Sequence, residues 1–424
     1  MAKHKKKKPQ APVKRSFAVT KTYFNQFSEV ARKILRLSDL DPSLFDSFSK
    51  KQKLDMMAIK TAPARVAIVR DSPVPRYYIR MVQADLTAFQ KEHFVQNDAS
   101  IGLTFYDLMT MGMVFLSYLE RFYSPPYTNL SDGRVIMAKK MSEITACGQT
   151  HFMCELQLHF QKVMIGLSKM NFRLYSYQFS WECGTASLCL IPWFRIEAIS
   201  AEVKVFRYKG VERSAFRVGI ATTDNRPIEW LSIPADRIFE GCEATRKLKV
   251  YVQNHALQRQ KERMDTTHPF FRNLALVGAI VDGAIVDAVN GQKLLVCSRR
   301  DEGPVGYFPF IVQNDCLFLL SFLPVANWLT PEGSRLFKAV NICKEDAIFL
   351  GMDKLSFYRK TDFDTIPLLK DALKEAGMWY LTEIIPSEEL LEIEKKSSGI
   401  IARFFEQTKE PDRIKILDEI AQDD

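Results

Sequence analysis

The sequence predicts a multidomain α+β protein, and three observations support this fold class. The chain has 424 residues, well over the ~150 residues of an ordinary domain. Apolar residues recur at spacings of three and four up to about residue 172 and then alternate, which indicates helices followed by strands. Two turn dipeptides, Asn290-Gly291 and Asn314-Asp315, mark antiparallel hairpins further along the chain. We therefore expect an N-terminal helical region, a central β-rich unit, and a C-terminal module of helices with a four-stranded antiparallel meander.

The helical region is predicted over residues 16–172. Its first helix carries one apolar stripe, formed by Tyr23, Phe24, Phe27, Val30, Ala31, Ile34 and Leu35. Asp41 followed by Pro42 is typical of an N-cap and a first-turn proline, and predicts a second helix over 42–60. Further helices are expected over 84–96, 103–123 and 134–170, the last as one long helix or two collinear ones.

The β-rich unit is predicted over residues 173–245. Alternating apolar residues lead into Lys209-Gly210, which reads as a hairpin turn, and continue after it. The α+β module follows over 246–381, with helices over 249–264 and 270–280 ahead of the meander. Thr330-Pro331-Glu332 indicates the start of another helix, and helices are also expected over 363–377 and 386–408.

Charge is distributed unevenly along a chain whose net charge is +9. Residues 1–15 hold seven basic and no acidic residues, whereas the predicted acidic helical tail, 382–424, holds 12 acidic and six basic residues. The basic arm is predicted to be disordered. In one interpretation it binds nucleic acid without sequence preference, through counterion release by Lys5, Lys6, Lys7 and Lys8. In the other, these lysines only keep the terminus soluble. Hydrophobic residues at 47% and charged residues at 26% exclude a wholly disordered, collagen-like or coiled-coil chain.

One segment contains a group of residues suited to catalysis. His255, Arg259 and Arg263 follow one another at spacings of four, so a helix aligns them on one face. An imidazole transfers protons near neutral pH, and guanidinium groups hold phosphate and stabilise its developing charge. This combination suits metal-independent RNA cleavage, in which the 2′-hydroxyl is the nucleophile. The alternative is a solvated amphipathic helix in which Glu262 pairs with a neighbouring base.

The pattern HAxxRxxER followed by an antiparallel meander resembles the small ribonuclease toxins of the colicin and RelE type, over about residues 250–340. The resemblance implies a helix packed against a four-stranded sheet. It also implies that the active groups lie on that helix and on or just after the later strands. The positions matched on the helix are His255, Arg259 and Arg263, and those matched on or after the strands are Arg299, Ser321 and Thr330.

The sequence thus predicts a cytosolic RNA-interacting protein whose C-terminal module is a metal-independent endoribonuclease. His255 would act as general acid or base. The phosphate would be bound by Arg259, Arg263 and Arg299, with Arg300 as a further contact. Ser321 or Thr330 would orient the phosphate. The alternative is a non-catalytic scaffold that binds nucleic acid or protein, an inhibitor included; the oligomeric state is left open.

No cofactor and no metal are expected. The cluster of Cys147, His151, Cys154 and His159 lies among apolar residues typical of a core. The eight scattered cysteines indicate reduced thiols in the cytoplasm. The most apolar stretch, 108–119, is shorter than the ~20 residues that span a bilayer, so no membrane association is expected.

Overall fold

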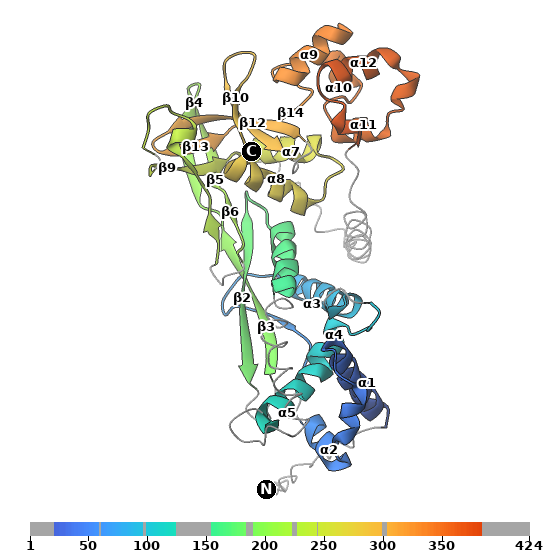
Figure 1. Ribbon diagram of the computed structural model, residues 1–424. Coiled ribbons are helices and arrows are strands. Elements are labelled where there is room, and N and C mark those ends of the chain that lie inside the picture. The colour runs from blue at the N-terminus through green and yellow to red at the C-terminus, as the bar shows by residue number, and fades with distance from the viewer. Residues whose placement is uncertain are drawn as a thin grey trace, which may run out of the picture. The chain divides into compact units, whose positions relative to one another are not determined.

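The computed structural model describes residues 21–58, 61–95, 99–123, 154–183, 190–222, 227–243, 245–298 and 303–383. Contacts within the chain define two compact units. Unit 1 comprises residues 1–161, 176–198 and 223–227, and unit 2 comprises residues 162–175, 199–222 and 228–424. Helices and strands both contribute to the fold, which confirms the predicted α+β class (Figure 1). The predicted basic arm and the helix expected over 386–408 lie outside the described residues.

Unit 1 is built on helices that enclose an aromatic core. Its elements include α1 (Lys21–Leu37), η1 (Pro42–Ser47), α2 (Lys50–Ala58), α3 (Arg76–Glu92), α4 (Phe105–Asp107), the π-helical turn η3 (Leu108–Gly112) and α5 (Met113–Tyr123). The predicted stripe of α1 is largely buried, and Phe27 packs edge-on against Phe45, with ring centroids 6.0 Å apart. Phe45 in turn packs against Phe115 of α5 at 5.8 Å. Aromatic pairs in this geometry stabilise a core beyond the area that they bury.

The helix predicted over 42–60 is interrupted. Asp41 caps η1 as expected, accepting a hydrogen bond from Ser43 N. The α-helix then starts again after Ser49, whose hydroxyl accepts from Gln52 N while Ser49 N donates to Gln52 Oε1. Such a reciprocal capping box marks a new N-terminus. The helix expected over 84–96 begins earlier, at Arg76, directly after Pro75. Of the long helix expected over 134–170, the described part is helical over 154–167.

The strands expected in one β-rich unit belong to three sheets. In the first, β1 (Arg65–Ile68), β3 (Leu190–Ser200) and β2 (Arg173–Cys183) are neighbours in that order. A two-stranded sheet joins β6 (Gly219–Ile220) to β7 (Glu229–Trp230). The remaining strands, β4 (Val203–Tyr208), β5 (Val211–Arg217) and β8 (Ser232–Pro234), join the main sheet of unit 2.

The main sheet of unit 2 has the order β10-β11-β12-β13-β9-β5-β4. The bounds of its other strands are β10 (Ile285–Asp287), β11 (Lys293–Ser298), β12 (Pro304–Gln313), β13 (Cys316–Leu319) and β9 (Lys247–Val252). Strands β10 to β13 form the predicted antiparallel meander. Off this path, β14 (Leu323–Pro324) pairs with β12 and β8 pairs with β9.

Two details of the module differ from the prediction. The helix expected from Lys249 starts only at Asn254, because Lys247–Val252 is a strand that pairs in parallel with β13. Its exposed lysines alternate with buried Leu248 and Val250, which is a strand pattern. The loop at Asn290-Gly291 is also longer than two residues: Ala288 N donates to Gln292 O, and Gly291 has a φ of 79°. The Asn314-Asp315 turn is the two-residue left-handed turn expected.

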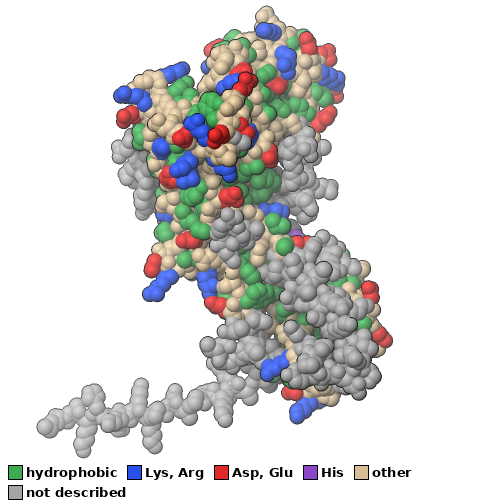
Figure 2. Space-filling model, turned by 60° about the vertical axis from the view of Figure 1, so that its left-hand side comes forward, with side chains coloured by type: hydrophobic (Ala, Val, Ile, Leu, Met, Phe, Trp, Pro, Cys, Tyr) green, Lys and Arg blue, Asp and Glu red, His purple; other side chains and the backbone are tan. Residues whose placement is uncertain are grey.

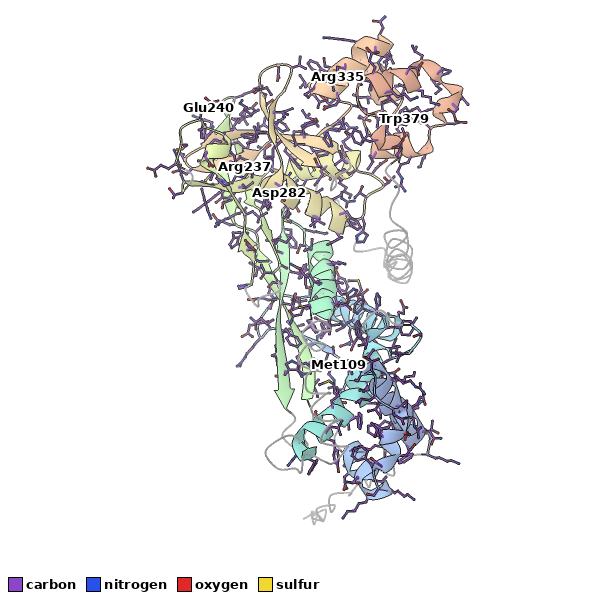
Figure 3. All side chains as sticks on the ribbon, viewed as in Figure 1. Met109, Arg237, Glu240, Asp282, Arg335 and Trp379 are labelled. Carbon is purple, nitrogen blue, oxygen red and sulfur yellow. The ribbon has the colours of Figure 1, made fainter. Side chains whose placement is uncertain are left out.

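The two faces of the main sheet are covered differently. Helix α8 (Pro269–Asp282) buries Leu276 and Ile280 within the larger core. Arg237 donates to the carbonyls of Ile280, Val281 and Gly283 at the end of α8, satisfying oxygens that a helix C-terminus leaves unpaired (Figure 3). A second, aromatic core joins the β4–β5 hairpin to the sheet and contains Phe206, Ala215, Tyr251, Cys316, Phe318 and Leu320.

Unit 2 also contains the helices α9 (Pro331–Val340), α10 (Lys344–Phe349), α11 (Leu355–Lys360), α12 (Pro367–Glu375) and α13 (Tyr380–Glu383). Arg335 ties α9 to the end of α12 through the carbonyl of Ala376, and Trp379 lies near the amines of Lys370 and Lys374 (Figure 3). Within the described ranges, no helix has both the length and the apolar character needed to cross a bilayer.

Candidate functional site

The candidate site lies where β9 passes into α7 (Asn254–Arg263). Gln253 N donates to Leu319 O at the end of the β9–β13 ladder, and Ala256 N then donates to Gln253 O as the helix begins. Strands β9 and β13 are parallel, so their carboxyl ends meet at one edge of the sheet. The start of α7 and Ser321, two residues beyond β13, are therefore brought to the same edge.

Helix α7 has one buried face and one face with the titratable groups. Ala256, Gln260 and Met264 are buried, and Gln260 Nε2 donates to Arg272 O of α8 at 2.9 Å. His255 is exposed, and the side chain of Arg259 is 42% exposed. The first two members of the predicted stripe thus remain accessible to a ligand.

Arg263, the third member of the stripe, has a different role from the predicted one. It forms an ion pair with Asp353, in which the two side chains are only 17% and 11% exposed. Eight residues of α-helix rotate the side-chain direction by about 80° relative to His255, at 3.6 residues per turn. Arg263 therefore points toward the C-terminal helices and anchors α7 to them, and we exclude it from the phosphate-binding group.

Arg213 is a site residue that sequence reasoning missed. It lies on β5, which reaches α7 because Phe216 pairs with Val252 at the end of β9. Its guanidinium carbon lies 5.6 Å from the ring centroid of Tyr208, and its positive charge acts on His255. No local motif marks Arg213, since its proximity to α7 comes from pairing between strands that are distant in sequence.

The charges around His255 favour its neutral form. Partial burial lowers the pKa of the imidazole below its usual range, the positive charge of Arg259 lowers it further, and Arg213 adds to this, while the carboxylate of Glu262 opposes them. The ring is therefore predominantly neutral at pH 7 and can accept a proton. Arg259 pairs with Glu262 at 2.9 Å in an exposed i,i+3 arrangement. Such pairs are weak, so an incoming phosphate can compete for the guanidinium.

The other predicted site residues are placed as follows. Ser321 is half-buried at the sheet edge described above. Thr330 is fully buried and caps α9: its hydroxyl accepts from Gly333 N at 3.1 Å and hydrogen-bonds the carbonyls of Val325 and Asn327. We therefore assign Thr330 to the helix cap and not to the site. Arg299 and Arg300, like Lys5, Lys6, Lys7 and Lys8, lie outside the described residues.

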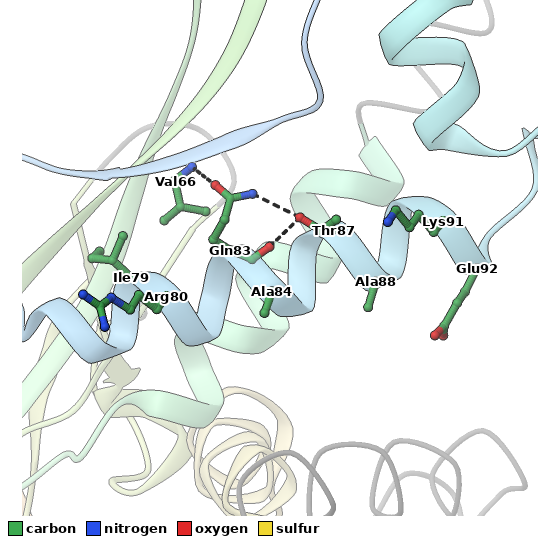
Figure 4. Close-up of a pocket in the computed structure, with 9 residues that line it drawn as sticks. All are labelled: Val66, Ile79, Arg80, Gln83, Ala84, Thr87, Ala88, Lys91 and Glu92. Carbon is green, nitrogen blue, oxygen red and sulfur yellow. Dashed lines mark hydrogen bonds between the residues drawn. The ribbon is translucent and has the colours of Figure 1, made fainter. Parts of the chain in front are cut away.

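Unit 1 contains a cavity of about 710 Å³ between α3 and β1 (Figure 4). Gln83 of α3 accepts from Val66 N at 2.8 Å and donates to Ala64 O, so it completes the hydrogen bonding of the β1 edge. Its Nε2 also donates to Thr87 Oγ1 of α3 at 3.3 Å, so the amide joins the strand to the helix (Figure 4). The nearby His159 hydrogen-bonds Asp85 at 2.8 Å, and among the described residues no group of three or more His, Cys, Asp or Glu side chains could hold a metal ion.

The chain was compared with known proteins at three levels. No family model, no curated protein and no solved structure matched it.

Proposed function

We propose that unit 2 binds RNA and cleaves it without a metal ion at the site formed by His255, Arg259 and Arg213. His255 accepts the proton of a ribose 2′-hydroxyl, whose oxygen then bonds to the adjacent phosphorus. The bond from phosphorus to the 5′-oxygen breaks, solvent protonates that oxygen, and a 2′,3′-cyclic phosphate is left. Arg259 and Arg213 stabilise the negative charge that develops on the phosphate oxygens, and the Ser321 hydroxyl orients them.

One juxtaposition carries this proposal: His255 and Arg259 lie one turn apart on α7, and β5, which carries Arg213, pairs with the end of β9 that leads into α7. A base that works near pH 7 must be unprotonated there, and the transition state that it serves is anionic. Cations that lower the pKa of the base and also bind the anion meet both needs. The packing of α7 and α8 with a four-stranded meander is also the arrangement that the resemblance to ribonuclease toxins implies, which supports the proposal.

The experiment is cleavage of an end-labelled single-stranded RNA by the purified full chain in EDTA. We expect cleavage by the unaltered protein and a loss of at least ~100-fold in rate for His255→Ala, the usual contribution of a general base. Lys261→Ala is the matched control, because Lys261 is an exposed cation of the same helix. An RNA with a single 2′-deoxy nucleotide at the cleavage position should resist cutting there. Equal cleavage by His255→Ala, or cutting at the deoxy position, contradicts the mechanism.

A second candidate function is RNA or protein binding without catalysis. The pairing of Arg259 with Glu262 favours it, because the helix face is already partly neutralised in the absence of a ligand. In that case the protein retains RNA in a salt-sensitive manner but leaves it intact, or it binds no nucleic acid and acts on a protein partner.

We also propose that the protein works in the cytoplasm. Five cysteines of the described chain are free thiols, namely Cys154, Cys242, Cys297, Cys316 and Cys343. Free thiols persist in a reducing compartment. Labelling of the exposed Cys154 and Cys343 in intact cells with a thiol reagent tests this, since these cysteines would not react if they were oxidised.

A further inference from the structure

The β4–β5 hairpin forms one end of the main sheet, and the arm packs Phe206 and Ala215 into the aromatic core opposite α8. Its turn residues Lys209 and Gly210 have φ angles of 51° and 81°, the left-handed pair of a type I′ turn. Phe206 stacks on Phe318 of β13, with ring centroids 4.1 Å apart, and Gln313 Nε2 donates to Arg207 O at 2.8 Å. The arm therefore packs against β13 and the end of β12, and its exposed side chains are held in place by a buried core.

Two exposed cations, Arg213 and Lys209, lie toward the tip of this arm, beyond the part of the face that packs into the core. Arg213 is the cross-strand partner of Phe206, so it shares a face with Phe206 and Tyr208. The Tyr208 ring lies 5.6 Å from the Arg213 guanidinium carbon and 5.4 Å from Lys209 Nζ. Both cations are exposed, and neither forms an ion pair within the described part of the chain. The two positive charges therefore lie on either flank of one tyrosine ring.

The opposite face of the arm differs in charge. Arg207 points away from Tyr208 because successive strand residues alternate, and its direct cross-strand partner is Glu212. Figure 2 shows one face of the molecule, on which basic and acidic side chains are interspersed. On a surface of mixed charge, the affinity for a polyanion depends more on where the cations lie than on the net charge.

We propose that Arg213 and Lys209, which lie beside Tyr208 toward the tip of the β4–β5 hairpin, bind the backbone of the RNA strand that extends from the cleavage site. This inference rests on the proposed function. Arg213 contacts the phosphate at His255, and Lys209 contacts a phosphate further along the same strand. Tyr208 holds the two side chains apart at fixed positions through its ring. The hairpin is thus a positioning element for the substrate, and Lys209 takes no part in the chemistry.

The test uses Lys209→Asn with Arg207→Gln as the matched control, each in the His255→Ala chain so that RNA stays intact. Asn-Gly suits a type I′ turn, so Lys209→Asn removes the charge without disturbing the hairpin. Binding of a fluorescent single-stranded RNA is measured by anisotropy at several salt concentrations. Loss of one phosphate contact should lower the logarithmic salt slope by about 0.7 and weaken binding about eightfold at about 50 mM salt and about threefold at about 200 mM. Arg207→Gln should change affinity less than twofold, because Arg207 lies on the opposite face, directly across from Glu212.

The outcomes separate this inference from the proposed function. Unchanged affinity and salt slope for Lys209→Asn, or equal losses for both variants, would overturn the inference even if RNA is cleaved. The predicted loss of affinity without any cleavage by the chain that retains His255 would support the hairpin as an RNA-binding element while contradicting catalysis. A hairpin that binds an acidic protein surface instead would leave both variants with the RNA affinity of the parent chain.

Discussion

The ion pair between Arg263 and Asp353 gives a quantitative test of how α7 is held. Replacing Asp353 with alanine leaves a guanidinium that is only 17% exposed without its carboxylate. Removing one partner of a buried ion pair costs about 3–5 kcal/mol, because the remaining charge stays desolvated. We therefore expect Asp353→Ala to lower the free energy of unfolding of unit 2 by about 3 kcal/mol or more.

The loss of stability in Glu262→Ala provides the control for the loss in Asp353→Ala. Glu262 and its partner Arg259 are 38% and 42% exposed, and exposed pairs of this spacing contribute about 0.2–0.5 kcal/mol. Urea unfolding with hydrogen exchange read from α7 amides measures both losses. Asp353→Leu combined with Arg263→Met should recover most of the stability, because it removes the unpaired charge and keeps the volume. If Asp353→Ala and Glu262→Ala cost equally little, Arg263 is not a structural anchor and its exclusion from the site is wrong.

Three further predictions concern His255, Thr330 and Ser321. Cleavage should slow on acidification as His255 gains a proton, with an apparent pKa below its ordinary 6.5. Arg259→Gln should move the acidic limb of the pH–rate profile to higher pH, because it removes a positive charge beside His255. The pH–rate profiles of both proteins check this. Thr330→Ala should cost about 0.5–2 kcal/mol of stability through the lost helix cap and leave RNA affinity unchanged, as urea unfolding and RNA binding will show. Ser321→Ala should slow cleavage about ten- to hundredfold by removing a hydrogen bond to a charged group; an unchanged rate removes Ser321 from the site.

Features that depend on neighbouring residues could be predicted from the sequence. The stripe of α1, the Asp41 cap and the left-handed turn at Asn314-Asp315 all follow from side chains within a few positions of one another. The meander also followed from local turns and alternation. By contrast, the strand Lys247–Val252 could not be separated from the helix that follows it. Its six residues are too few to distinguish the two-residue repeat of a strand from the 3.6-residue repeat of a helix.

The candidate site was only partly predictable because its geometry depends on distant pairing. His255 and Arg259 share a face by helical spacing alone, because both lie within the helix Asn254–Arg263. Arg213 reaches them through the β5–β9 ladder, and Arg263 is drawn away by Asp353, 90 residues later. No local pattern encodes either contact. The sequence therefore predicted the helix that carries His255, while tertiary structure decides which cations lie beside it.

The most direct measurement of the central claim is the chemistry of the RNA ends produced in EDTA. The account predicts that the full chain yields fragments ending in a 2′,3′-cyclic phosphate, identified by mass spectrometry, and that His255→Ala yields none while Lys261→Ala does. Intact RNA, or the same fragments from His255→Ala, would contradict the role given to His255.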